Sequence, residues 1–173
     1  MRLKTLALLM LMVASASPAA AGELFGGVYA HAVNTPLSLD SGKERGADFQ
    51  LGFRGGDMFG RLRLQPYAFG AVNSSGGTDY VAVGLSRKFG DRLFIRPGVG
   101  LAIHDGSVAK FEVPGRIAFG SRLLFEPELG IGARIAPRLT VEASWVHMSH
   151  AQLFGGQNPG IDNIGGRVSL ALP

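Results

Sequence analysis

The segment Leu93-Phe94-Ile95-Arg96-Pro97-Gly98-Val99-Gly100-Leu101-Ala102-Ile103-His104 decides the fold class of this chain. Its odd-numbered positions are all apolar, whereas its even-numbered positions mix small, charged and aromatic side chains. Because the side chains of a β-strand alternate between the two faces of a sheet, this pattern predicts a strand with one apolar face. Tilted strands of ~9–11 residues are long enough to cross a bilayer.

The same alternation recurs along most of the chain and predicts an all-β protein. Tight connections such as Gly90-Asp91 and Ala136-Pro137 alternate with longer ones. Short turns at one end and longer loops at the other are typical of transmembrane barrels. Eight strands are predicted, at about 24–33, 45–55, 61–70, 79–89, 92–104, 120–135, 138–149 and 161–172.

The second face of these strands carries many of the 26 glycines, together with arginine and glutamate. This composition favours a narrow polar lumen, with the apolar face turned outward to lipid. We therefore expect an eight-stranded antiparallel transmembrane β-barrel. The alternative is a periplasmic lipid-binding barrel whose apolar face points inward. The expected lumen charges, which compensate each other, are Arg96, Glu126, Glu128, Arg134 and Glu142.

The N-terminus has the features of an export signal. Two basic residues, Arg2 and Lys4, precede an apolar run at 6–13 and a small-residue cleavage site at Ala19-Ala20-Ala21. The run is shorter than the ~20 residues of a spanning helix, which argues against a retained anchor. We expect a cleaved signal peptide at residues 1–21, a barrel domain at 22–173, and residence in the outer membrane of a Gram-negative cell.

Charge and composition limit the partners. The chain has a net charge of +4 and no cysteine, so a disulfide framework and a thiol nucleophile are both excluded. Nucleic acid is a poor partner for an exported protein, whereas anionic outer-membrane lipids, including lipopolysaccharide phosphates, suit its basic side chains. The sequence leaves the oligomeric state open, and a homodimer is one option.

Three polar residues extend the apolar faces of the last two predicted strands. His147 and Ser149 continue the apolar row of 138–149, and Asp162 shares the apolar parity of 161–172. Residues two apart on a strand lie roughly 7 Å apart, within reach of side-chain contact. The residue types match the nucleophile, base and orienting acid of serine hydrolases. The alternative is that both strands end earlier, leaving these residues solvated in a loop.

These residues also resemble a known signature. The stretches His147-Met148-Ser149-His150-Ala151 and Gln157-Asn158-Pro159-Gly160-Ile161-Asp162 are similar to the C-terminal motif of the PagL-type lipid A 3-O-deacylases. The resemblance implies an outer-membrane esterase that removes the 3-O-linked acyl chain of lipid A without a cofactor. It assigns Ser149 as nucleophile, His147 as base and Asp162 as acid. This chain has Asp162 where the family has glutamate, and His150 where it has asparagine.

Other residues receive weaker assignments. By the same resemblance Asn158 shapes the site, and His150, or backbone N–H groups beside it, would hold the oxyanion. Trp145 is expected as an interfacial aromatic or as part of an acyl-chain groove. A metal pair of His147 and His150 is disfavoured because their odd spacing puts them on opposite faces, so no metal is expected. The functional alternative is a non-catalytic structural or adhesive barrel.

Overall fold

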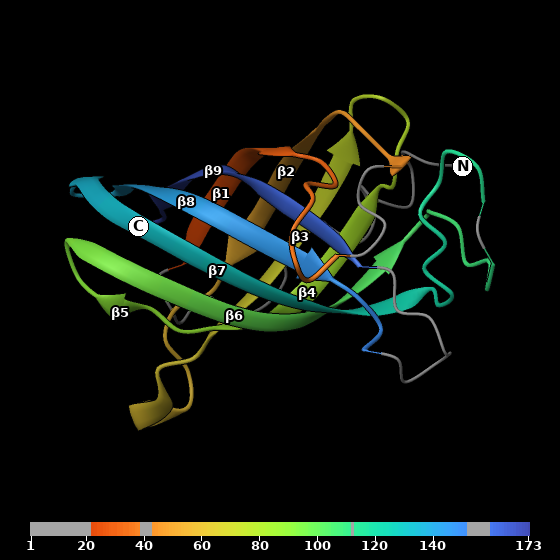
Figure 1. The fold of residues 1–173 in the computed structure, drawn as a ribbon. Helices are drawn as coiled ribbons and strands as arrows, with labels where there is room; N and C mark the ends of the chain where they lie inside the picture. Colours follow the sequence, from red (N-terminus) through yellow and green to blue (C-terminus); the bar gives the residue numbers. More distant parts are fainter. Residues whose placement is uncertain (1–21, 39–42, 112, 152–159) are drawn as a thin grey trace.

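Every long strand pairs antiparallel with its neighbour, so the sheet curls into a barrel (Figure 1). This computed structural model describes residues 22–38, 43–111, 113–151 and 160–173. The predicted signal peptide, residues 1–21, lies outside the described residues. The strands are β1 (Glu23–Ala30), β2 (Ala47–Arg54), β3 (Gln65–Asn73), β4 (Tyr80–Ser86), β5 (Phe89–Gly90), β6 (Leu93–His104), β7 (Leu123–Ala136), β8 (Leu139–Met148) and β9 (Ile161–Ala171).

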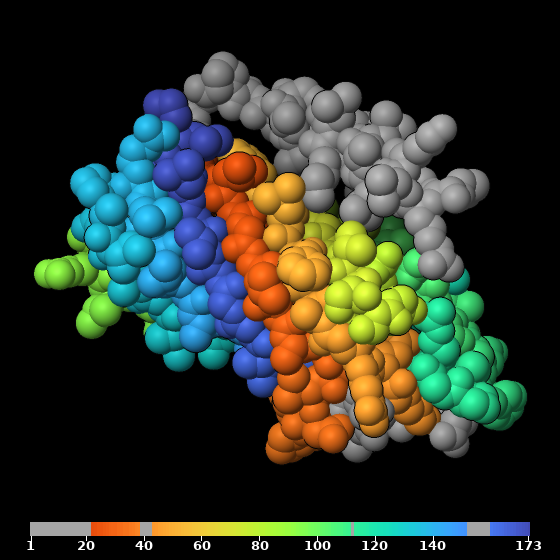
Figure 2. Space-filling model, turned by 90° about the horizontal axis from the view of Figure 1, so that it is seen from above, coloured from red at the N-terminus to blue at the C-terminus, as the bar shows by residue number. Residues whose placement is uncertain are grey.

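The barrel closes where the first and last strands meet. β1 pairs with β9 along its whole length, from Glu23 opposite Ala171 to Ala30 opposite Ile164. Figure 2 shows this seam, with β9 in blue beside β1 in red. On the other side β4 pairs directly with β6, and the two-residue β5 only extends the hairpin between them. Eight long strands therefore form the closed antiparallel barrel that the sequence predicts.

The apolar rows face outward. In β6 the odd positions from Leu93 to Ile103 are exposed, whereas Arg96 and His104 on the other face are buried. An apolar outer wall and a polar interior are the arrangement of a barrel embedded in lipid. The alternative of a soluble barrel with an inward apolar face is therefore wrong. Among the described residues, no helix is long and apolar enough to cross a membrane.

The lumen contains a network of arginine–glutamate pairs beside a cluster of buried aromatic side chains. Glu128 accepts hydrogen bonds from Arg54 at 2.9 Å and from Arg167 at 2.7 Å. Arg96 reaches both Glu23, at 2.7 Å, and Glu142, at 3.2 Å. Buried charges are tolerated when each has a partner. The predicted lumen positions 96, 126, 128 and 142 are all buried.

Arg134 is the exception to the predicted lumen charges. It lies near the end of β7, exposed, and pairs with Asp91 at 2.6 Å. β7 bulges between Arg134 and Ala136, at the rim of the barrel. The alternation correctly gave its side of the strand, but it could not show that the strand rises beyond the lumen at this residue.

Two predicted strands begin too early. β3 starts at Gln65 rather than near residue 61, because residues 55–64 form a separate loop with a 3-10 turn at Gly60–Leu62. β7 starts at Leu123 rather than near residue 120. Gly120 has a φ of +73°, a left-handed conformation that does not fit a strand. The β2–β3 connection is therefore long, although it lies at the end of the barrel where short turns were expected.

Candidate functional site

The candidate site lies on neighbouring strands β8 and β9. His147 of β8 is directly opposite Asp162 of β9 in the ladder. Ser149 continues the strand beyond its last residue, because its backbone N–H and C=O both bond to Phe125 of β7, at 3.1 and 2.8 Å. The alternative that these residues are solvated in a loop is therefore wrong.

The three side chains form a continuous hydrogen-bonded chain. Nδ1 of His147 lies 2.9 Å from Oδ1 of Asp162, and Nε2 of His147 lies 3.0 Å from Oγ of Ser149. A carboxylate can only accept, so the bonded Nδ1 carries the proton. Nε2 is then free to accept the hydroxyl proton of Ser149. This polarity is the one that a base-activated serine requires.

The trio faces the outer wall but is shielded from solvent. His147 is 8% exposed, Ser149 7% and Asp162 0%. The segment after β1 folds over this part of the wall. The N–H of Val33 donates to the backbone oxygen of Asp162 at 2.7 Å, and the hydroxyl of Thr35 donates to its Oδ2. The β1–β2 connection thus covers the carboxylate.

Trp145 contacts both ends of the acid–base pair. Its ring stacks on the imidazole of His147, with centroids 5.9 Å apart and planes inclined by 25°. Its indole N–H donates to Oδ1 of Asp162 at 2.7 Å. Trp145 pairs with Ile164 in the ladder, so Asp162 is its diagonal neighbour, within reach of a long side chain. The alternation along the strand predicts the face on which Trp145 lies, but not this bond.

Three donors therefore fix the carboxylate of Asp162. Trp145 and His147 share Oδ1, while Thr35 holds Oδ2. Thr35 was not among the predicted site residues, because it is 127 residues from Asp162 along the chain. The signal that could have found it is barrel closure, since pairing the first and last strands brings the β1–β2 connection next to the start of β9.

The predicted oxyanion donors are only partly available. The N–H of Ser149 bonds to Phe125 and cannot also bind substrate. His150 is buried, and its side chain lies beside Gly120. A Cβ added at Gly120 would be 3.5 Å from Nε2 of His150. Asn158 lies outside the described residues. In the part of the chain that the structure describes, no three His, Asp or Glu side chains are arranged to hold a metal ion.

A buried ion cluster joins three loops at the same end of the barrel. His31, just after β1, contacts Asp48 at 2.8 Å and Glu44 at 3.1 Å through its two ring nitrogens. Glu44 also accepts backbone N–H groups from Thr78, at 2.7 Å, and Ile117, at 3.2 Å. Burial disfavours the imidazolium, but the two carboxylates outweigh it and raise the pKa of His31 to about 9. Burial likewise opposes the charge of Glu44, yet these hydrogen bonds lower its pKa to about 2.

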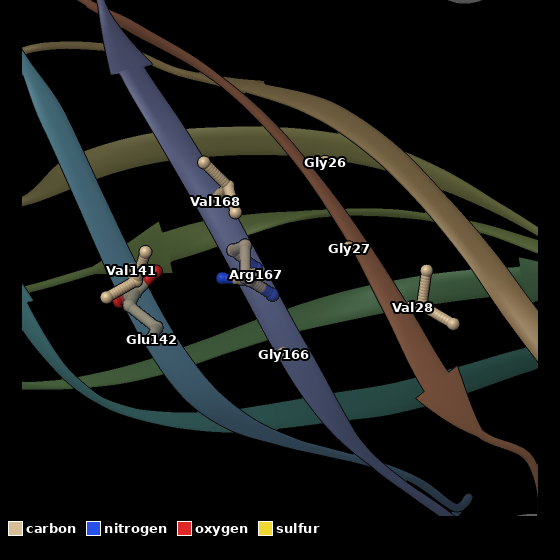
Figure 3. A pocket seen from close by; sticks show the side chains of 8 residues that line it. All are labelled: Gly26, Gly27, Val28, Val141, Glu142, Gly166, Arg167 and Val168. Atoms are coloured by element: carbon tan, nitrogen blue, oxygen red, sulfur yellow. The ribbon is translucent and has the colours of Figure 1, made fainter.

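A shallow groove runs along the outer wall on the strands that carry the trio, β8 and β9, and on β1. Gly26 and Gly166 form its floor, flanked by Val28, Val141 and Val168 (Figure 3). Gly166 and Asp162 lie on the same face of β9, four residues apart, or about 13 Å at the usual strand rise. The groove is lined mainly by apolar atoms and opens on the lipid-facing side of the barrel.

The fold and this arrangement define a class of protein: a small outer-membrane barrel with a hydrolase-like trio on its outer wall. The family model described as lipid A 3-O-deacylase (PagL) matches residues 28–171. The chain therefore belongs to the PagL family of lipid A 3-O-deacylases. It is an ester hydrolase of the outer membrane whose substrate is lipid A.

Solved structures agree on the fold. The crystal structure of the outer membrane enzyme PagL is similar with a TM-score of 0.62 and 23% identity, covering 87% of this chain and 99% of that chain. A de novo designed transmembrane β-barrel gives a TM-score of 0.53 at 12% identity, covering 90% and 98%. Neisserial surface protein A gives 0.50 at 11% identity, covering 87% and 97%. Comparison with curated protein sequences gave no significant match.

Proposed function

We propose that this enzyme cleaves the 3-O-linked acyl ester of lipid A by a Ser-His-Asp mechanism on the outer wall of the barrel. The observation that carries the proposal is the unbroken hydrogen-bonded chain from Ser149 through His147 to Asp162. Both bonds have lengths at which a proton can be transferred or held. Lipid A is itself a membrane lipid, so a site on the outer wall can receive it directly from the membrane.

In the first half-reaction, Oγ of Ser149 attacks the ester carbonyl while its proton passes to Nε2 of His147. The charged imidazole is stabilised by Asp162, which accepts the Nδ1–H bond at 2.9 Å. The tetrahedral intermediate then breaks its bond to the 3-oxygen of the sugar. His147 returns the proton to that oxygen, which leaves as a hydroxyl, and the acyl group remains on Ser149.

In the second half-reaction, water takes the place of the sugar. His147 removes a proton from the water, which attacks the acyl-serine carbonyl. Collapse of the intermediate releases the hydroxy fatty acid, and the proton returns to Oγ of Ser149. No cofactor enters either step. His150, through its side chain or its backbone N–H, is our proposed partner for the oxyanion, with Asn158 shaping the loop beside it.

The groove on the outer wall offers a place for the acyl chain. A chain lying over Gly26 and Gly166 would contact three valines while its ester end points toward Ser149. Trp145 borders the same face between the groove and the trio. Contact with apolar side chains orients the chain without requiring water to be excluded by a lid.

A serine-directed fluorophosphonate tests the nucleophile. The purified barrel should gain the mass of one phosphonyl group, located on Ser149 by peptide mapping. His147→Asn should react much more slowly, because the serine hydroxyl would lose its base. Ser144→Ala is a matched control, since Ser144 lies on the same strand but is buried on the lumen face. Labelling that persists in Ser149→Ala would refute the assignment.

A further inference from the structure

The long β2–β3 connection, residues 55–64, lies at the end of the barrel opposite the candidate site. Figure 1 shows it as a yellow excursion with one helical turn that projects away from the barrel wall. Met58 and Leu64 are bridged by paired backbone hydrogen bonds of 2.8 and 3.1 Å. Asp57 accepts from Arg63 at 2.6 Å and from Gln65 at 2.9 Å. The loop is therefore an ordered projection.

Apolar side chains form its tip. Met58 is 45% exposed, Phe59 60% and Leu62 56%. Phe59 and Arg63 have φ angles of 60° and 48°, in the left-handed region that side chains rarely adopt. An ordinary two-residue turn would be enough to connect β2 and β3. The loop instead adopts a strained conformation that holds its three apolar side chains outward.

Basic residues outnumber acidic ones at the end of the barrel that carries this tip. The connections at the same end of the barrel, with the last residues of β7, carry seven exposed or half-buried basic side chains and two acidic ones, a surplus of 7 − 2 = 5 positive charges. The two acids, Asp57 and Asp91, already pair with Arg63 and Arg134. The seven basic residues are Arg61, Arg63, Arg87, Lys88, Arg92, Arg134 and Arg138.

We propose that this apolar, basic tip docks on anionic phospholipid headgroups of the leaflet at the short-turn end of the barrel. The lipid-facing row of β2, with Phe49 and Leu51 exposed, leads directly into the loop, so the tip continues an existing membrane surface. Apolar side chains that enter the interface, combined with basic side chains at the membrane surface, bind a protein to anionic lipid. The charge surplus selects an anionic leaflet.

A single cysteine label tests the depth of the tip, because the chain has no cysteine of its own. Phe59→Cys carries an environment-sensitive fluorophore, and the barrel is folded into phosphatidylcholine vesicles with or without phosphatidylglycerol. Headgroup-region spin-labelled lipid should quench this label at least about twofold more strongly when phosphatidylglycerol is present. Ser75→Cys, an exposed position at the other end, is the control and should stay unquenched. Equal, weak quenching at both positions in both vesicles would overturn the proposal.

Charge reversal tests the role of the arginines. Arg61→Glu with Arg92→Glu should abolish the extra quenching that phosphatidylglycerol gives, and replacing both by lysine should retain it. Both arginines are exposed, so the barrel should still fold. Quenching unchanged by the reversal would overturn the electrostatic part of the proposal. If the fluorescence of the label changed with the protein-to-lipid ratio and not with the anionic lipid content, the tip would contact a second copy of the protein. That result would contradict the proposal.

Discussion

The indole N–H of Trp145 donates to the same oxygen of Asp162 that receives the Nδ1–H of His147, at 2.7 and 2.9 Å. Aspartate is one methylene shorter than the glutamate found at this place in the family, so its carboxylate has less reach. Here it lies directly across the ladder from His147, and Trp145 and Thr35 fix its two oxygens. We infer that Trp145 and Thr35 are positioning residues that hold the short side chain of Asp162 in line with the imidazole of His147.

Trp145→Phe should lower kcat without a large change in KM. Phenylalanine keeps an aromatic ring against His147 but removes the donor to Asp162. A hydrogen bond to a charged group contributes roughly 1.5–3 kcal/mol, so the loss should be roughly tenfold or more if the bond acts fully in the transition state. Release of the hydroxy fatty acid from lipid A in detergent micelles measures it. Wild-type kcat in Trp145→Phe would show that the bond is incidental.

Thr35→Val should reduce kcat to a similar extent. The substitution keeps the branched shape of the side chain but leaves Oδ2 of Asp162 without its hydroxyl donor. Thr35→Ser is the matched control, since it retains the hydroxyl and should keep most of the activity. The same assay compares the two variants. Equal activity in both would mean that the β1–β2 connection only covers the site.

Gly166→Leu should shift the preference for acyl-chain length. A Cβ at Gly166 would meet only the backbone oxygen of Glu142, at 3.8 Å, so the larger side chain fits the fold and fills the groove. The ratio of activity on long-chain to short-chain esters should fall several-fold. Val83→Leu, exposed on β4 across the barrel, is the control and should leave the ratio unchanged. An unaltered ratio in Gly166→Leu would place the acyl chain elsewhere.

The stability of the barrel should fall as the pH rises from about 6.5 to about 9. The pKa of His31 is raised from its usual 6.5 to about 9, so its contribution is complete below pH 6.5 and is lost as the pH passes through 9. The full effect amounts to about 3 kcal/mol. Urea unfolding in detergent at pH 6 and pH 10 measures it. His31→Gln should remove this pH dependence, whereas His104→Gln should not.

Glu128→Gln should destabilise the barrel strongly. It removes the carboxylate that Arg167 and Arg54 share. Arg54 keeps Glu23 at 2.7 Å, whereas Arg167 would be left as an uncompensated charge in the lumen. Breaking a buried ion pair costs about 3–5 kcal/mol. The control is Asp91→Asn at the exposed rim pair, where a change below ~1 kcal/mol is expected. Heat-modified gel migration gives the midpoints. Equal midpoints for both variants would contradict the proposed role of the network.

The alternation of apolar and polar residues was enough to predict most of the strands and the face of each that points outward. The row from Leu93 to Ile103 predicted both the strand and its outward face, because the period of a strand does not depend on distant contacts. Strand ends were less predictable. Residues 61–64 were predicted as the start of a strand, but they belong to the loop, in which Phe59 and Arg63 have a left-handed backbone that does not fit a β-ladder.

The candidate site likewise contains residues that the sequence could predict and residues that it could not. His147, Ser149 and Asp162 could be placed on one face by parity, since neighbouring antiparallel strands keep their register. Thr35 could not, because its contact depends on how the β1–β2 connection bends over the wall. The bond from Trp145 depends on a rotamer, which no period in the sequence encodes. The alternation along each strand therefore identified the three residues. The contacts from Thr35 and Trp145 that hold them in place depend on the tertiary structure.

Mass spectrometry of lipid A from cells that express the protein tests the central claim most directly. With wild-type protein, lipid A should lose the mass of one 3-hydroxyacyl group, and with Ser149→Ala it should keep that group. Ser144→Ala, on the lumen face of the same strand, should behave as wild type. Both variants must show the heat-modified migration of a folded barrel. Loss of the acyl group with folded Ser149→Ala would contradict the account.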